Sequence, residues 1–200
     1  GHSRYLWAAE IYQQANHYGR YLTHGSMDTG GFSMPGWDWC HIPGTTAAVL
    51  PIDQMKANVL NVDEFSGYEE MLLSDEWFAG GVTHKGQNGA FAMKLHEHDK
   101  YNGTLRAKKS FFAVEGQIVC LGSDIENRLE GAPVHTTLFQ KSVNDANTEL
   151  VAEDGIIKDH DGVTYVVKDA PICYKIGLQS SLHEESNKPT EGFFEMAYID

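Results

Sequence analysis

Two histidines one residue apart, His96 and His98, flank Glu97 near the middle of the chain. In an extended strand, residues i and i+2 face the same side, so the two imidazoles would point one way and Glu97 the other. Two imidazoles on one face can bind a metal ion if further ligands come from elsewhere. No further ligand follows at a recognisable spacing, so two interpretations stay open: a metal pair, or polar residues near the end of a strand.

A second group of candidate residues lies in an aromatic loop, where Gly-Trp-Asp-Trp at 36–39 precedes Ile-Pro-Gly-Thr-Thr at 42–46. Trp37 and Trp39 next to glycines can stack on a ring-shaped ligand, often a sugar. They can equally form the plug that closes one end of a β-sandwich. The pattern alone leaves both roles open.

Cations that could meet an anionic ligand are few and scattered. Arg4 lies near the start of the chain, and Arg20 and His24 follow in the segment Tyr-Gly-Arg-Tyr-Leu-Thr-His-Gly at 18–25. An arginine on a strand can reach an active site, although an isolated arginine is usually a solvated or ion-paired group. The run Arg-Ala-Lys-Lys at 106–109 is interpreted as a solvated strand face rather than a sulfate clamp.

The overall charge excludes some partners. The 200 residues hold 15 lysines and arginines against 28 acidic residues, a net charge of −13. This argues against a nucleic-acid or anionic-membrane binder, which would present a basic face. No apolar stretch approaches the length of a membrane span. An anionic substrate held by a few local cations remains compatible with this composition.

The three cysteines, Cys40, Cys120 and Cys173, are widely spaced and form no zinc-type pairing. Cys120 and Cys173 lie in apolar runs, so we expect buried free thiols. The redox compartment stays open.

The elements that would position these residues are short and rich in β-formers. We predict strands at 5–12, 89–96, 105–114, 117–122, 135–143, 162–168, 172–178 and 193–199. Turns are expected at 102–103, 114–117 and 159–162, and a short helix at 68–76. Residues 25–88 are the least regular part, where we expect long ordered loops. The sequence therefore predicts an all-β protein with little helix, built as one large antiparallel sandwich.

Three sets of segments, in this order and spacing, resemble one family. They are the aromatic loop at 36–46; Phe-Ala-Gly-Gly-Val at 78–82 with Ala-Lys-Lys-Ser at 107–110; and Ile-Val-Cys-Leu-Gly-Ser at 118–123 with His-Thr-Thr-Leu-Phe-Gln at 135–140. Together they look like the central β-domain of the family 8 polysaccharide lyases. The segments at 19–25 and 187–192 look most like the broad-specificity chondroitinase ABC branch.

The resemblance implies a fold and an activity. The fold would be a galactose-mutarotase-like supersandwich, with residues 1–200 forming one domain. That domain would follow an N-terminal α/α toroid, precede a C-terminal β-domain, and be inactive alone. The family cleaves uronic-acid-containing polysaccharides by β-elimination, here chondroitin or dermatan sulfate and possibly hyaluronan. The implied location is secreted or periplasmic in a bacterium.

The resemblance also implies site residues. Arg4 looks like the family's catalytic arginine and Glu97 like its catalytic glutamate, while the catalytic His and Tyr would lie on the toroid. Trp37, Trp39, Arg20 and His24 are the candidates for substrate binding. No cofactor or metal ligand is assigned, and a divalent cation in the parent enzyme is left unassigned. The partners implied are an anionic polysaccharide and the toroid of the same parent chain.

Two other function classes remain as alternatives. The tryptophan loop suggests a non-catalytic carbohydrate-binding sandwich. The pair His96 and His98 suggests a metal-dependent, cupin-like enzyme.

Overall fold

The fold is all-β in every part that the structure describes. The computed structural model describes residues 35–38, 41–49, 76, 78–96, 104–144, 150–182 and 189–200, and these contain strands and turns but no helix. Within them there is also no helix long and apolar enough to cross a membrane. The predicted strand 5–12, the turn at 102–103 and all but the last residue of the predicted helix 68–76 lie outside the described residues.

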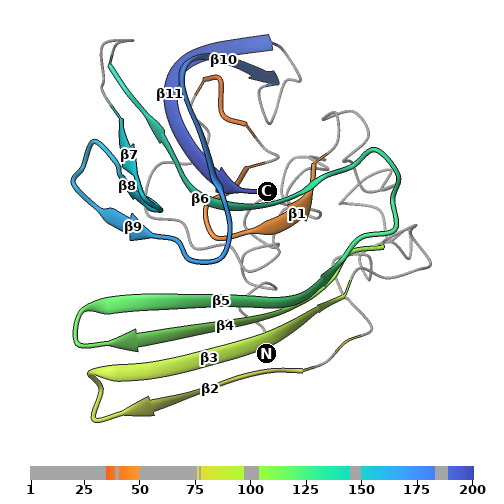
Figure 1. Ribbon diagram of the computed structural model, residues 1–200, viewed down its shortest axis with the longest axis vertical. Coiled ribbons are helices and arrows are strands. Elements are labelled where there is room, and N and C mark those ends of the chain that lie inside the picture. The colour runs from red at the N-terminus through yellow and green to blue at the C-terminus, as the bar shows by residue number, and fades with distance from the viewer. Residues whose placement is uncertain are drawn as a thin grey trace, which may run out of the picture.

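Eleven strands form three antiparallel sheets among the described residues (Figure 1). The first sheet has the order β1-β6-β11-β10, the second β2-β3-β4-β5 and the third β7-β8-β9. In chain order the strands are β1 (Thr46–Ala48), β2 (Ala79–His84), β3 (Asn88–His96), β4 (Arg106–Val114), β5 (Gln117–Glu126), β6 (Val134–Ser142), β7 (Val151–Glu153), β8 (Ile156–Lys158), β9 (Thr164–Val166), β10 (Ile172–Leu182) and β11 (Pro189–Ile199).

The strand predictions at 89–96, 105–114, 117–122, 135–143, 162–168, 172–178 and 193–199 are confirmed as β3, β4, β5, β6, β9, β10 and β11. The turn at 114–117 is confirmed as well. Glu115 and Gly116 both have positive φ, 51° and 79°, the pattern of the primed turns that suit tight hairpins. Four short strands were not predicted, and β1 and β2 lie inside the stretch expected to be loop. The pair Gly80-Gly81 lies in the stretch expected to be loop, but it is accommodated in the edge strand β2.

Two apolar cores hold the sheets. The first joins β3 and β4 to the start of β6; its buried members are Met93, Leu95, Leu105 and Ala107, with Val134 packed against them. The second lies between the first and third sheets and contains Phe139, Ile157 and Ala197. In Figure 1 the β2–β5 sheet extends as a separate layer beside the curved sheet of β6, β10 and β11.

Two sequence-based expectations about burial are wrong. Cys120 is exposed, because β5 is an edge strand in which every residue is exposed. Lys109, expected on a solvated face, is buried, because alternate residues of β4 face the first core. Its ammonium donates a hydrogen bond to the carbonyl of Gly44, which ties β4 to the loop before β1. Burial lowers the pKa of Lys109 to about 8.

Candidate functional site

The aromatic loop of the sequence analysis is pressed against the ends of β10 and β11. Gly36 has φ +84°, and a Cβ atom added there would lie 2.4 Å from the backbone nitrogen of Gly192 and 2.7 Å from the carbonyl oxygen of Gln179. The backbone N–H of Gly36 donates to the Thr190 hydroxyl at 2.9 Å. A glycine is therefore required at position 36 for two reasons, the positive φ and the close approach of two strands.

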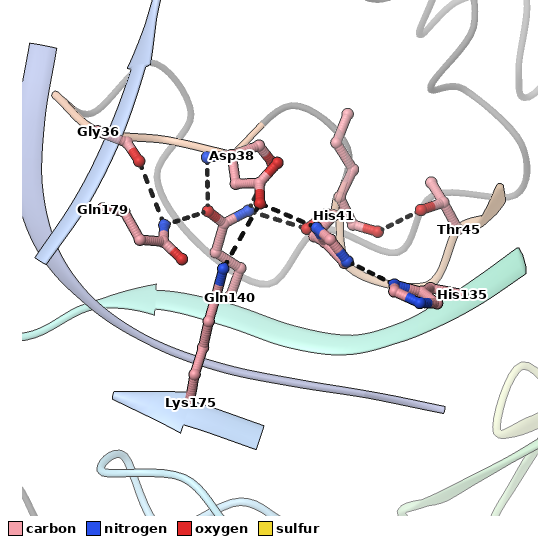
Figure 2. Close-up of polar contacts among 9 residues, drawn as sticks. Gly36, Asp38, His41, Thr45, His135, Gln140, Lys175 and Gln179 are labelled. Atoms are coloured by element: carbon pink, nitrogen blue, oxygen red, sulfur yellow. Dashed lines mark hydrogen bonds and ion pairs between the residues drawn. The ribbon is translucent and has the colours of Figure 1, made fainter. Parts of the chain in front are cut away.

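Two buried glutamines hold the backbone of this loop (Figure 2). Gln140 on β6 accepts from the N–H of Asp38 at 2.7 Å, and its amide donates to the carbonyls of Asp38 at 3.0 Å and His41 at 2.8 Å. Gln179 on β10 donates to the carbonyl of Gly36 at 3.2 Å and to the side-chain oxygen of Gln140 at 3.0 Å. The two side chains satisfy buried polar groups of the loop that no sheet ladder reaches.

A chain of acid and base groups runs along the same loop. His41 Nδ1 lies 2.9 Å from Asp38 Oδ2, and His41 Nε2 lies 2.8 Å from His135 Nδ1 on β6. His135 Nε2 faces Asp200 Oδ1 at 3.8 Å. Tyr198 on β11 stacks on the His135 ring with a centroid separation of 4.2 Å. The order Asp38–His41–His135–Asp200 therefore places two imidazoles between two carboxylates.

This arrangement limits the number of protons that the pair of histidines can hold. With both rings neutral, His41 donates to Asp38 and accepts from His135. One added proton is accommodated on His135 Nε2, which then presents an N–H to Asp200 while His135 Nδ1 still donates to His41. A second added proton would place two N–H groups face to face at the 2.8 Å contact between His41 Nε2 and His135 Nδ1. Burial, with a contribution from His41, lowers the pKa of His135, while Asp200 and Asp38 oppose the shift.

Trp37, one of the predicted sugar-binding residues, is buried with 2% of its surface exposed. Its ring packs edge to face on Phe194 of β11, with centroids 6.2 Å apart. These contacts are those of the structural plug, one of the two roles that the sequence left open. A role in stacking on a sugar stays a prediction.

A second polar cluster joins the turn between β8 and β9 to the first sheet. The Glu195 carboxylate on β11 is fully buried and accepts from the His160 backbone N–H at 2.9 Å, with His160 Nδ1 at 2.7 Å. Lys141 on β6 donates to Asp159 and Asp161 at 2.7 Å each. Among the described residues no group of three or more His, Cys, Asp or Glu side chains could hold a metal ion. The hydrogen bonds and ion pairs of this cluster attach the small sheet to β6 and β11.

The structure places only part of the predicted site. Arg4, Arg20, His24, Trp39, Glu97 and His98 lie outside the described residues. His96 is described: it is the last residue of β3, half-buried, and opposite Arg106 of β4. Glu97 therefore directly follows a strand whose register is fixed.

Sequence reasoning missed the residues that organise the aromatic loop. His41 lies in the loop itself and Gln140 in the quoted segment at 135–140, but neither was singled out. Both strands also carry Lys and Ser, so no local signal distinguishes Gln140 and Gln179 as buried partners. Which backbone groups they contact could not be inferred, because the partners are about a hundred or more positions away.

The fold and the loop together define an antiparallel β-sheet domain. Residues 2–164 match the model of polysaccharide lyase family 8, super-sandwich domain, and the chain belongs to this family. The family resemblance stated from the sequence is thereby confirmed.

Similar proteins are found among curated enzymes and solved structures. The chain is 49% identical over 218 aligned positions to a chondroitin sulfate ABC exolyase of Bacteroides thetaiotaomicron. It is 38% identical to a chondroitin sulfate ABC exolyase of Proteus vulgaris. Each alignment covers 100% of this chain but only 22% of the relative. The crystal structure of Streptomyces coelicolor A3 chondroitin AC lyase in complex with chondroitin sulphate has the same fold, with a TM-score of 0.63, 18% identity and coverage of 92% of this chain and 25% of that one.

Proposed function

We propose that this chain is the β-domain of a glycosaminoglycan lyase that cleaves chondroitin or dermatan sulfate by β-elimination, with hyaluronan as a further candidate substrate. The observation that carries the proposal is the 49% identity, across the whole chain, to a protein named chondroitin sulfate ABC exolyase. The substrate is an anionic polysaccharide, and the domain works with an N-terminal toroid of the same parent chain. The location is secreted or periplasmic, and this chain supplies no cofactor ligand.

The residue types at the proposed site suit this elimination. The reaction removes the C5 proton of a uronic acid. Because this proton is only weakly acidic, the negative charge that develops at the neighbouring carboxylate must be stabilised. Arg4 supplies a permanent planar cation with several donors for that carboxylate. A nearby cation also lowers the pKa of a tyrosine from the toroid, which then removes the C5 proton and returns a proton to the leaving oxygen.

Glu97 holds the cation or the tyrosine hydroxyl in place through a charge-assisted hydrogen bond. The position of Glu97 supports this assignment, because it immediately follows β3, whose pairing with β4 is continuous up to His96. Arg20, His24 and Trp39 are the proposed contacts to the sugar chain, and Trp37, buried against Phe194, is proposed to hold the aromatic loop in place.

The test uses the full-length parent protein and chondroitin sulfate, and follows the ultraviolet absorbance of the unsaturated product. Arg4→Ala and Glu97→Gln are each expected to lower kcat/KM by about 10²–10⁴-fold. The matched controls are Arg128→Ala and Glu153→Gln, which remove the same charges at exposed positions. Near-normal turnover in both site variants contradicts the site assignment. Absence of product from the unsubstituted enzyme with chondroitin, dermatan and hyaluronan contradicts the function.

The isolated chain provides a second test of the divided site. Because the catalytic His and Tyr are assigned to the toroid, purified residues 1–200 are expected to yield no unsaturated product. Appreciable product from this chain alone would show that the whole catalytic set lies within it.

A further inference from the structure

The two histidines that meet between the aromatic loop and β6 share one hydrogen bond (Figure 2). His41 Nε2 lies 2.8 Å from His135 Nδ1, so one of these nitrogens carries a hydrogen and the other accepts it. The His41 side chain is 7% exposed and the His135 side chain 11%, which leaves little room for water to replace either partner. The contact therefore requires that one of the two facing nitrogens be free of hydrogen.

The charged and titratable groups that face this pair come, among the described residues, from the loop and from β10, β11 and the end of the chain. Asp38 Oδ2 is 2.9 Å from Nδ1 of His41. Asp200 Oδ1 is 3.8 Å from Nε2 of His135. β1, which pairs with β6 on the other side, carries no titratable side chain. The remaining groups are Lys175, 3.8 Å from the Asp38 carboxylate, Tyr198, stacked on His135, and Cys173, the register partner of Tyr198.

The charges of these groups favour one added proton and oppose a second. Two carboxylates and one ammonium give the surroundings a net charge of −1 while both rings are neutral, and a first added proton cancels it. A second added proton puts an N–H on both facing nitrogens and two like charges side by side. Burial, and after it the neighbouring His41, lowers the pKa of His135, so the doubly charged pair is reached only in acid.

The two sides of the contact differ in how firmly they are held. His135 lies on β6, which is hydrogen-bonded to β1 on one side and to β11 on the other, and Tyr198 covers its ring. His41 lies in a turn: its N–H donates to the carbonyl of Asp38 at 3.1 Å, and its own carbonyl accepts from Gln140 at 2.8 Å. When the two rings repel each other, we therefore expect the turn at 41–45 to move and the strand to stay.

We propose that the contact between His41 and His135 is an acid-sensitive switch that holds the turn at 41–45 on β6. The turn stays bound while the two rings hold at most one added proton, and His41 leaves β6 when both rings are charged. The change is local, because the core around Met93 and Leu95 is apolar and has no part in the contact. The switch goes beyond the proposed lyase activity and does not require it.

Hydrogen–deuterium exchange of backbone amides in the full-length parent protein, read by mass spectrometry of its peptides, tests the switch between about pH 7 and 5. Protection is expressed relative to the unfolded chain at each pH, which removes the direct effect of pH on the exchange rate. The reporting peptide covers Gly44 and Thr45, whose N–H groups donate to carbonyls of β6 and of the turn itself. The reference peptide covers Met93 and Leu95 in the core of β3.

In the unsubstituted protein, protection at 44–45 is expected to fall at least about tenfold from pH 7 to 5, while the reference peptide keeps its protection. His135→Gln is expected to keep its protection at both pH values, because a glutamine side chain has a donor and an acceptor and can meet His41 in either state. His41→Gln is the second variant, in case the first disturbs β6, and should behave alike. His84→Gln, at an exposed position of β2, is the matched control and should show the full fall.

Constant protection at 44–45 in the unsubstituted protein overturns the proposal, as does an equal fall in either ring variant. Low protection at both pH values in both ring variants also overturns it, since the histidines would then be structural only. A parallel loss in the reference peptide shows global unfolding and overturns the local switch. A parent protein without lyase activity that gives the expected exchange pattern would refute the proposed function alone.

Discussion

The two four-stranded sheets bury different chemistry. The sheet of β1, β6, β11 and β10 buries Thr46, Thr137, Gln140, Gln179 and Glu195, whereas the β2–β5 sheet buries Met93, Leu95 and Ala107 with a single charged side chain, Lys109. In the first sheet the glutamines serve a loop that lies against the strands. In the second sheet the strands pack mainly on each other, and within the described part of the chain β5 is exposed along its whole length. Polar burial therefore marks the sheet that positions a loop, and apolar exposure marks the edge of the other sheet.

The largest expected effect is the destabilisation caused by one added methyl group, compared between a position next to the first sheet and a position in a turn of the second. Gly36→Ala places Cβ against backbone atoms of β10 and β11, which cannot move without breaking the ladder. We expect a loss of more than about 4 kcal/mol in the free energy of unfolding, or failure to fold. Gly86→Ala is the control: it has a similar positive φ in the β2–β3 turn but open space around it, so about 1–2 kcal/mol is expected. Equal losses in denaturant titrations would refute the close-approach argument.

The next effect concerns Lys109, whose buried ammonium links β4 to the loop before β1. Its folded pKa of about 8 lies below the ordinary 10.5, so its favourable contribution is present above pH 10.5 and is lost as the pH falls towards 8. The difference, 10.5 minus 8, corresponds to about 3 kcal/mol.

In Lys109→Met this pH dependence is expected to vanish. The measurement is the unfolding free energy of native and variant protein between pH 7 and about pH 10.5, with Lys108→Met as the exposed control. A native-minus-variant difference that stays constant with pH would contradict the burial of a titrating ammonium.

Removing a glutamine that serves the loop is expected to cost less. Gln140→Leu leaves the N–H of Asp38 and the carbonyls of Asp38 and His41 without their amide partner, a loss of about 2 kcal/mol. Gln117→Leu on the exposed β5 strand is the control and should stay within about 0.5 kcal/mol of the native protein. If the two variants have the same unfolding midpoint, the loop does not depend on Gln140.

The smallest effect is the response to acid. The pKa of His135 is lowered in the folded protein, so its contribution to stability is present above the unfolded value near 6.5 and is lost as the pH falls below it. We expect the loss of stability between about pH 7 and 5 to be smaller in His135→Gln than in the native protein. His84→Gln, at an exposed position of β2, should leave the acid response unchanged. An unaltered response in His135→Gln would show that the histidine pair does not sense pH.

The sequence predicted strands well where their side chains alternate between a core and a second environment. The strands β3, β4, β6, β10 and β11 were found within a few residues of their ends, because turn residues bound them. By contrast, β1 consists of three fully buried residues and has no alternation, and β2 begins with Ala-Gly-Gly, which imitates a turn. Short strands of these kinds carry too little local signal.

The candidate site was predictable only in its local parts. The aromatic loop was recognisable from Trp37 and its glycines, and the family from ordered motifs. The partners of the loop were not, because Gln140, Gln179 and His135 reach it through a sheet order, β6-β11-β10, that is set by long-range pairing. Burial of Cys120 was predicted from its apolar neighbours, and this prediction was wrong. The exposed edge strand β5 has the same apolar composition as a buried strand, so the sequence does not distinguish the two.

The two glutamines form hydrogen bonds only with the backbone of the loop and not with its side chains. Every bond that Gln140 and Gln179 make to the loop ends on a backbone N–H or carbonyl, of Gly36, Asp38 or His41. These bonds fix the path of the loop backbone whichever side chains the loop carries. For protein engineering, exchanging the loop between relatives therefore requires the two glutamines and the glycine at 36 to travel with it, together with Phe194 and His135, which meet the side chains of Trp37 and His41.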